Sequence, residues 1–151
     1  MSKASNTFEG ELLDLLFLNA ALAGIGNAAG LQPAGVAGNF YIRLCTDAVA
    51  VDDATLGTEC AYTGYVAGGV PVPRTAAGWQ RTDNEVSNVA EVAFGACTAG
   101  SENIQYAELW KDNVNTGEAY RVAWMEFAAV KPVSAGVTPR WAAGALKFTM
   151  D

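Results

Sequence analysis

Short segments of alternating polar and apolar residues recur through most of this chain, and they restrict its fold more than any other feature. Such alternation is typical of strands that bury one face and expose the other to water. The clearest segments span residues 39–46, 78–94, 102–112 and 118–130. Turn-forming Gly, Pro, Asn and Asp separate the segments at spacings of about 8–12 residues. About seven or eight short strands spaced in this way predict a mainly β protein, a β-sandwich or jelly-roll-like domain.

The chain begins differently, with apolar residues at the spacing of an α-helix. Asn6 or Thr7 can cap this helix, and acidic residues follow in its first turns, where the helix dipole favours them. The pattern predicts a helix over about residues 7–23, followed by a loop rich in Gly, Ala and Pro. We therefore expect an N-terminal arm over residues 1–38 and a β-sandwich domain over residues 39–151.

The predicted helix is apolar on almost every side at its middle, so it needs cover on more than one face. Burying one large apolar side chain contributes about 1.5–3 kcal/mol, which makes exposure of several of them costly. A single sheet covers only one face of a helix, so a neighbouring subunit is expected to cover the rest. The expected interface residues are Phe8, Leu12, Leu16, Phe17 and Leu31.

The first residues match neither a secretion signal nor a membrane span. Lys3 is the only early cation, and acidic residues follow it, which is the wrong polarity for a signal peptide. No charge occurs between Leu15 and Ile42, but repeated glycines and Pro33 interrupt the apolar run. A span needs about 20 consecutive, mostly apolar residues. We therefore expect neither export nor insertion in a membrane.

Charge and composition exclude several classes of function. The net charge is −7 and the nine Lys and Arg are scattered, whereas nucleic acids and anionic membranes require basic patches. The chain has no histidine, and so lacks the commonest general base and transition-metal ligand. Cys45, Cys60 and Cys97 match no metal or redox spacing. Free thiols are expected, with an intersubunit disulfide as the alternative, and neither a cofactor nor a metal is predicted.

Carboxylates and aromatic residues are the remaining candidates for a site. Glu108 and Glu126 lie on a predicted hairpin and can form a glycosidase-like pair, although carboxylates near turns are usually solvated. We expect no enzyme. The tryptophans are expected to pack in the core, and the alternative is a glycan or partner contact through Trp79, Trp110 or Trp141.

Several short motifs occur in a recognisable order along the chain. They include ELLDLLFLN, NFYIRLCTD, TECAYTGY and the closing VTPRWAAGALKFTMD. In this order the chain resembles a group of small virion proteins of tailed bacteriophages, often called phage tail fiber proteins, from Asn6 to Asp151. Many relatives carry His where this chain has Cys45, so no role of that histidine is carried over.

The resemblance implies a virion component, made in the cytoplasm of a bacterial host and bound to other virion proteins. Those partners are the major capsid protein or tail proteins, and no catalytic residues are implied. An extended fiber needs repeats or a coiled coil, and the sequence shows neither. Our main hypothesis is therefore a non-enzymatic decoration or cement protein on the outer head surface, a homo-oligomer and most simply a trimer. The alternative is a structural or receptor-binding protein associated with the tail or a tail fiber.

Overall fold

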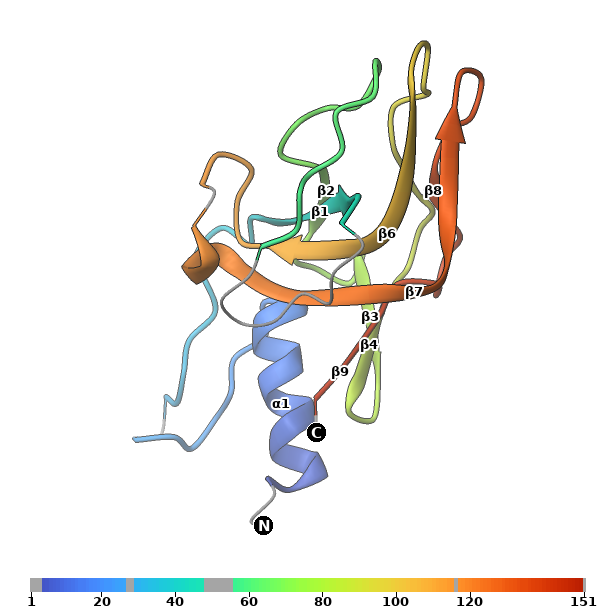
Figure 1. Cartoon of the computed structure of the whole chain (residues 1–151). Helices are drawn as coiled ribbons and strands as arrows, with labels where there is room; N and C mark the ends of the chain where they lie inside the picture. The colour runs from blue at the N-terminus through green and yellow to red at the C-terminus, as the bar shows by residue number, and fades with distance from the viewer. Residues whose placement is uncertain (1–3, 27–28, 48–55, 116, 151) are drawn as a thin grey trace. The chain divides into compact units, whose positions relative to one another are not determined.

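A computed structural model describes residues 4–26, 29–47, 56–115 and 117–150 (Figure 1). Within these residues the fold is mainly β, as predicted, with one N-terminal α-helix and antiparallel sheets consistent with a β-sandwich. The elements, in chain order, are α1 (Asn6–Phe17), β1 (Asn39–Cys45), β2 (Val70–Pro73), β3 (Trp79–Thr82), β4 (Glu85–Asn88), β5 (Val92–Ala93), β6 (Ser101–Trp110), the 3-10 helix η1 (Glu118–Tyr120), β7 (Arg121–Ser134), β8 (Arg140–Trp141) and β9 (Lys147–Thr149).

The chain divides into two compact units, each built from segments that are distant in the sequence. The first unit contains residues 1–38, 73–91 and 142–151, and the second contains residues 39–72 and 92–141. The expected N-terminal arm therefore groups with two later segments of the chain. These segments supply the three-stranded sheet β3-β4-β9.

Helix α1 is shorter than its apolar pattern predicts. Its N-cap is Ser5, whose hydroxyl accepts a hydrogen bond from the Phe8 N–H at 3.3 Å, in place of the predicted Asn6 or Thr7. The helix ends at Phe17 rather than near residue 23, because Asn19 adopts the left-handed backbone conformation (φ 53°), which Asn tolerates. No helix in the described part of the chain is long and apolar enough to cross a membrane.

One face of α1 packs within the first unit. Leu13 and Phe17 are buried, each with 3% of its surface exposed. The Phe17 ring meets Trp79 of β3 edge to face, with ring centroids 4.9 Å apart, and stacks on Phe148 of β9 at 6.0 Å. The helix therefore obtains much of its cover from strands of its own unit.

The second unit is organised around the four-stranded sheet β2-β1-β6-β7, in which β6 pairs antiparallel with both β1 and β7. Directly opposed residues of antiparallel strands point to the same face. One face is apolar, since Ile42 opposes Leu109 and Leu44 opposes Ala107, all of them buried. The opposite face carries the pair Arg43 and Glu108. A two-stranded sheet, β5-β8, completes this unit.

Candidate functional site

Two charged residues lie buried on the polar face of the four-stranded sheet. Arg43 of β1 has 4% of its surface exposed, and Glu108 of β6 has 1%. A buried charge destabilises the fold unless it is paired and hydrogen-bonded. The hydrogen-bond and ion-pair partners of Arg43 and Glu108 therefore indicate the role of this face of the sheet.

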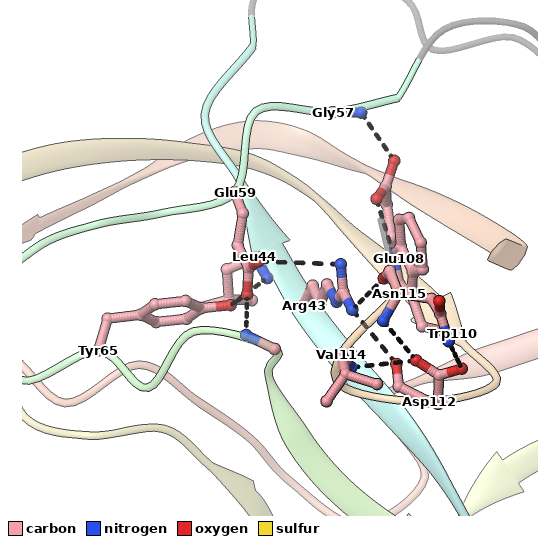
Figure 2. A network of polar contacts seen from close by, with 11 residues as sticks. Arg43, Leu44, Gly57, Glu59, Tyr65, Glu108, Trp110, Asp112, Val114 and Asn115 are labelled. Atoms are coloured by element: carbon pink, nitrogen blue, oxygen red, sulfur yellow. Dashed lines mark hydrogen bonds and ion pairs between the residues drawn. The ribbon is translucent and has the colours of Figure 1, made fainter. Parts of the chain in front are cut away.

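Both carboxylate oxygens of Glu108 accept hydrogen bonds from protein donors (Figure 2). Oε1 accepts from the Gly57 N–H at 2.9 Å and from the Arg121 guanidinium at 3.1 Å, and Oε2 accepts from Trp110 Nε1 at 2.9 Å. Gly57 has to be glycine, because a Cβ at that position would lie 2.7 Å from Sγ of Cys45. Glu108 thus joins β6, β7 and the segment around residue 57.

Arg43 extends in the other direction, to the loop that follows β6. Its Nη2 donates to the carbonyl oxygens of Asp112 at 3.2 Å and Asn115 at 3.0 Å. Its guanidinium lies 3.9 Å from the centroid of the Trp110 ring, and Nη1 lies 3.9 Å from a Glu59 oxygen. One buried arginine therefore holds the backbone of a surface loop at two points.

Glu59 connects the same network to a further loop. Its Oε1 accepts hydrogen bonds from the Tyr65 hydroxyl and from the Gly68 N–H, both at 2.8 Å. The Tyr65 oxygen in turn accepts from the Leu44 N–H of β1 at 3.2 Å. Burial of the phenol, and then the negative charge of Glu59, raise the pKa of Tyr65, so this hydroxyl keeps the proton that it donates.

Asp112 closes the loop that Arg43 holds. Its Oδ1 accepts from the backbone N–H groups of Val114 at 3.0 Å and Asn115 at 2.7 Å, and Oδ2 accepts from Asn115 Nδ2 at 2.7 Å. The hydrogen bond from the Asn115 backbone is the first cause that lowers the pKa of Asp112. Such contacts are typical of Asx turns, which order a loop locally.

We call Arg43, Glu59, Glu108 and Asp112 the loop-anchoring network, because their contacts fix loop segments at residues 57–59, 65–68 and 112–115. Most donors and acceptors of the network bind other parts of the chain, although Nε of Arg43 is buried without a hydrogen-bond partner. Glu108 is buried with both oxygens occupied, so it is unavailable to a substrate, and the alternative of a glycosidase-like pair with the exposed Glu126 loses one of its two carboxylates. Among the described residues, no group of three or more His, Cys, Asp or Glu is arranged to hold a metal ion.

The expected interface residues lie in different environments within the first unit. Phe8 and Leu31 are exposed, at 39% and 43%, whereas Leu12 and Leu16 are half-buried. Phe17 is buried among aromatic rings of its own unit, so it has no surface left for a partner. The expectation that Phe17 anchors a neighbour is thereby corrected. Its aromatic partners, which come from β3 and β9, could not be identified from the helical pattern alone.

Two of the three tryptophans named for the alternative glycan or partner contact are buried. Trp79 and Trp110 are buried, at 0% and 2% exposure, so neither can stack on a glycan. Trp141 is half-buried and packs on Phe127, with ring centroids 5.2 Å apart. Trp124 of β7, which the sequence reasoning did not single out, is 39% exposed. The sequence does indicate this exposure, because Trp124 lies two residues before the polar Glu126 on an alternating strand and so shares its face.

Comparison with known proteins identifies the family. The sequence model of the family described as podophage GP4 fiber I protein gp80 matches residues 3–149. The chain belongs to this phage fiber protein family. It is therefore a virion component, as the resemblance of its motifs implied, and a fiber-family protein associates with other proteins of the virion. No curated protein matches the chain.

Proposed function

We propose that this chain is a non-enzymatic structural component of a phage tail fiber. The observation that carries the proposal is the family match, which covers nearly the whole chain and names a fiber protein. This assignment favours the tail over the head surface that was our main hypothesis from the sequence. The sequence argument required repeats or a coiled coil within this chain, whereas a compact module can form one part of a fiber built from several chains.

The loop-anchoring network supports a structural role. Catalytic carboxylates need access to a substrate, and at least one must have a free oxygen to give or take a proton. Glu108 has 1% of its surface exposed and accepts three hydrogen bonds. Its charge serves to join strands and loops, as expected of a module that must keep its shape in a virion.

The part of the uncharged run that lies in the first unit, from Leu15 to Gly38, supports attachment to other virion proteins through this unit. Leu31 and Phe8 are large apolar side chains that this unit leaves exposed. An uncharged segment approaches an acidic neighbour without repulsion, which matters for a chain of net charge −7. In the proposal Phe8, Leu12, Leu16 and Leu31 contact neighbouring chains, and these chains include copies of this one, most simply in a trimer.

Locating the protein on purified particles tests the tail-fiber assignment. Antibody labelling should mark the tail, and quantitative gel staining should give a copy number close to that of tail proteins. Labelling spread over the head, with a copy number close to that of the major capsid protein, would overturn the proposal in favour of decoration.

A matched pair of variants tests the contact residues. Leu31→Ser should lower incorporation into particles, because it removes an exposed apolar side chain of the first unit. Val66→Ser changes a 66% exposed valine of the second unit and serves as the control. Equal incorporation of the two variants would contradict the proposed contact. Both should unfold at the temperature of the parent protein, since neither residue is buried.

A further inference from the structure

Strand β7 lies at one edge of the four-stranded sheet and, with 14 residues, is the longest strand that the structure describes (Figure 1). Among the described strands it pairs with β6 only. The backbone of an edge strand is a template for a strand of another chain, and proteins either block such an edge or use it. The outer edge of β7 is therefore a candidate contact surface.

The opposite edge of the same sheet is blocked. It is formed by β2, in which Pro71 and Pro73 have no N–H to donate. Prolines are tolerated in edge strands where the missing N–H faces away from the sheet. The outer edge of β2 therefore offers few donors to the β7 of a neighbouring copy, which disfavours a head-to-tail chain of sheets. The remaining pairing between copies is that of one β7 with another, about a two-fold axis.

One segment of β7 is regular and open. Residues 123–126 oppose β6 without interruption, between two irregularities of register. Lys131 and Pro132, which are residue types that discourage edge pairing, lie beyond the second irregularity. We call residues 123–126 the edge segment. It contains neither Lys nor Pro, so nothing in its sequence blocks a neighbouring strand.

The edge segment is complementary to itself in one antiparallel register. Directly opposed residues share a face, so a two-fold axis perpendicular to the sheet passes through a residue, here Trp124 or Met125. With the axis at Met125, Trp124 of each copy opposes Glu126 of the other. The indole N–H can then donate to the carboxylate, as Trp110 Nε1 donates to Glu108 at 2.9 Å within the chain. With the axis at Trp124, Glu126 would instead oppose an apolar side chain.

The exposure and charge of these side chains fit the register centred on Met125. Trp124 is 39% exposed and Glu126 is also exposed, so both are accessible to a second copy. Glu126 is the only charged residue of the edge segment, and because it opposes Trp124, no like charges meet. We infer that two copies of the chain pair antiparallel through the edge segment and so join their four-stranded sheets into one.

The edge segment is too short to hold two free molecules together tightly. A stable interface covers about 800 Å² on each partner, which exceeds what a short strand edge supplies. The pairing therefore acts between copies that are already held close, at an effective concentration of the order of ~1 mM. The inference rests on the proposed function for this tethering, because contacts of the first unit with other virion proteins bring the copies together.

Disulfide cross-linking of the full chain at ~1 mM tests the register. Met125→Cys should give a dimer on a non-reducing gel that reductant removes, because the two introduced thiols face each other across the axis. Ala123→Cys and Trp124→Cys are the matched controls and should give much less dimer, since each opposes a different residue. The parent should give none, because its three cysteines are buried.

Charge variants test the same register by sedimentation equilibrium. Trp124→Glu should lower the association constant about tenfold or more, because carboxylates then oppose each other. Trp124→Glu/Glu126→Lys should restore association, since a carboxylate then opposes an ammonium group. Val66→Glu adds the same charge at an exposed residue outside β7 and should leave association unchanged.

Two results would overturn the inference. One is a Met125→Cys variant that gives no more dimer than Ala123→Cys. The other is a double variant that associates no better than Trp124→Glu while both keep the melting temperature of the parent. A head location of the protein, or equal incorporation of Leu31→Ser and Val66→Ser, would contradict the proposed function and leave the cross-link at Met125 intact.

Discussion

Arg121 of β7 donates to Glu108 of β6 across 3.1 Å, and the two side chains are only 3% and 1% exposed. Lys147 and Glu85 form a second ion pair between neighbouring strands, at 2.8 Å, but their side chains are 56% and 34% exposed. The chain therefore offers one buried and one solvated pair with similar strand geometry. A solvated pair contributes little to stability, whereas a buried charge that loses its partner is very unfavourable.

Arg121→Ala should destabilise the fold by about 3–5 kcal/mol, because it leaves the Glu108 carboxylate buried without its counter-charge. Lys147→Ala should cost about 0–1 kcal/mol, since water screens that pair. Urea unfolding followed by circular dichroism measures both changes.

The double variant Glu108→Met/Arg121→Met removes both charges and should lose less stability than Arg121→Ala alone. Equal costs for Arg121→Ala and Lys147→Ala would show that burial does not govern the Glu108–Arg121 pair.

Alternation in the sequence predicted β1, β6 and β7 of the second unit, including the pairing of residues 102–112 with 118–130. It predicted one strand over residues 86–94, which the structure divides into β4 and β5 in different sheets. It did not predict the loop-anchoring network. Arg43 lies in a strand whose alternate residues are apolar. A strand with one face in water has the same pattern, so the sequence does not distinguish a buried Arg43 from a solvated one. The residues that bury it, such as Asp112 and Asn115, are distant in sequence, and periodicity carries no information about such contacts.

The helix shows the same limit. Apolar spacing identified its residues but not its length, because a single left-handed residue, Asn19, ends it. The pattern also could not tell which of Phe8 and Phe17 is buried, because the two look equivalent in the sequence. Only the position of Trp79 and Phe148 decides that Phe17 is core and Phe8 is surface.

Phe17→Ala should therefore destabilise the first unit by about 3–5 kcal/mol, the usual cost of removing a buried phenylalanine. Phe8→Ala should stay within about 0.5 kcal/mol, as exposed substitutions do. Thermal unfolding compares the two, and near-ultraviolet circular dichroism should show a changed Trp79 environment in Phe17→Ala only. A destabilised Phe8→Ala would mean that the surface assignment of Phe8 is wrong.

Arg74 caps the C-terminal end of α1. Its Nε and Nη2 donate to the carbonyl oxygens of Leu16 at 2.6 Å and Leu15 at 3.1 Å, and Nη1 donates to that of Ala37 at 3.1 Å. Arg74→Ala should cost about 1.5–3 kcal/mol, the range for hydrogen bonds to a charged group, and should speed hydrogen exchange of the Leu18 amide.

Arg74→Lys is the informative companion to this variant. Lysine keeps the charge but lacks the planar fork that reaches three carbonyls, so it should recover only part of the loss. Full recovery would show that charge at the helix C-terminus matters and that the bonding geometry does not.

The three cysteines should be inert in the native protein. Cys45, Cys60 and Cys97 are buried, and burial raises the pKa values of Cys45 and Cys60 above their ordinary range. Because the thiolate is the reactive form, Ellman's reagent should label almost no thiol until denaturant is added, and then all three. Native labelling would contradict the buried, inert thiols. Fewer than three thiols labelled in denaturant, with a dimer on a non-reducing gel that reductant removes, would support the intersubunit disulfide instead.

The loop held by Asp112 should open in acid. The pKa of Asp112 in the native protein is lowered, first by the hydrogen bond from the Asn115 N–H. The carboxylate therefore stabilises the loop fully at pH values above the pKa of an unfolded Asp, about 3.9. This stability is lost as the pH falls through the lower native pKa, because a protonated carboxyl accepts these bonds less well. The amide signals of Val114 and Asn115 should shift together in that acidic range. The amide signals of the β1 residues whose side chains lie on the apolar face should stay unchanged. Asp112→Asn should remove the titration and leave the loop partly open at neutral pH. Amides that titrate unchanged in Asp112→Asn would assign the transition to another carboxylate.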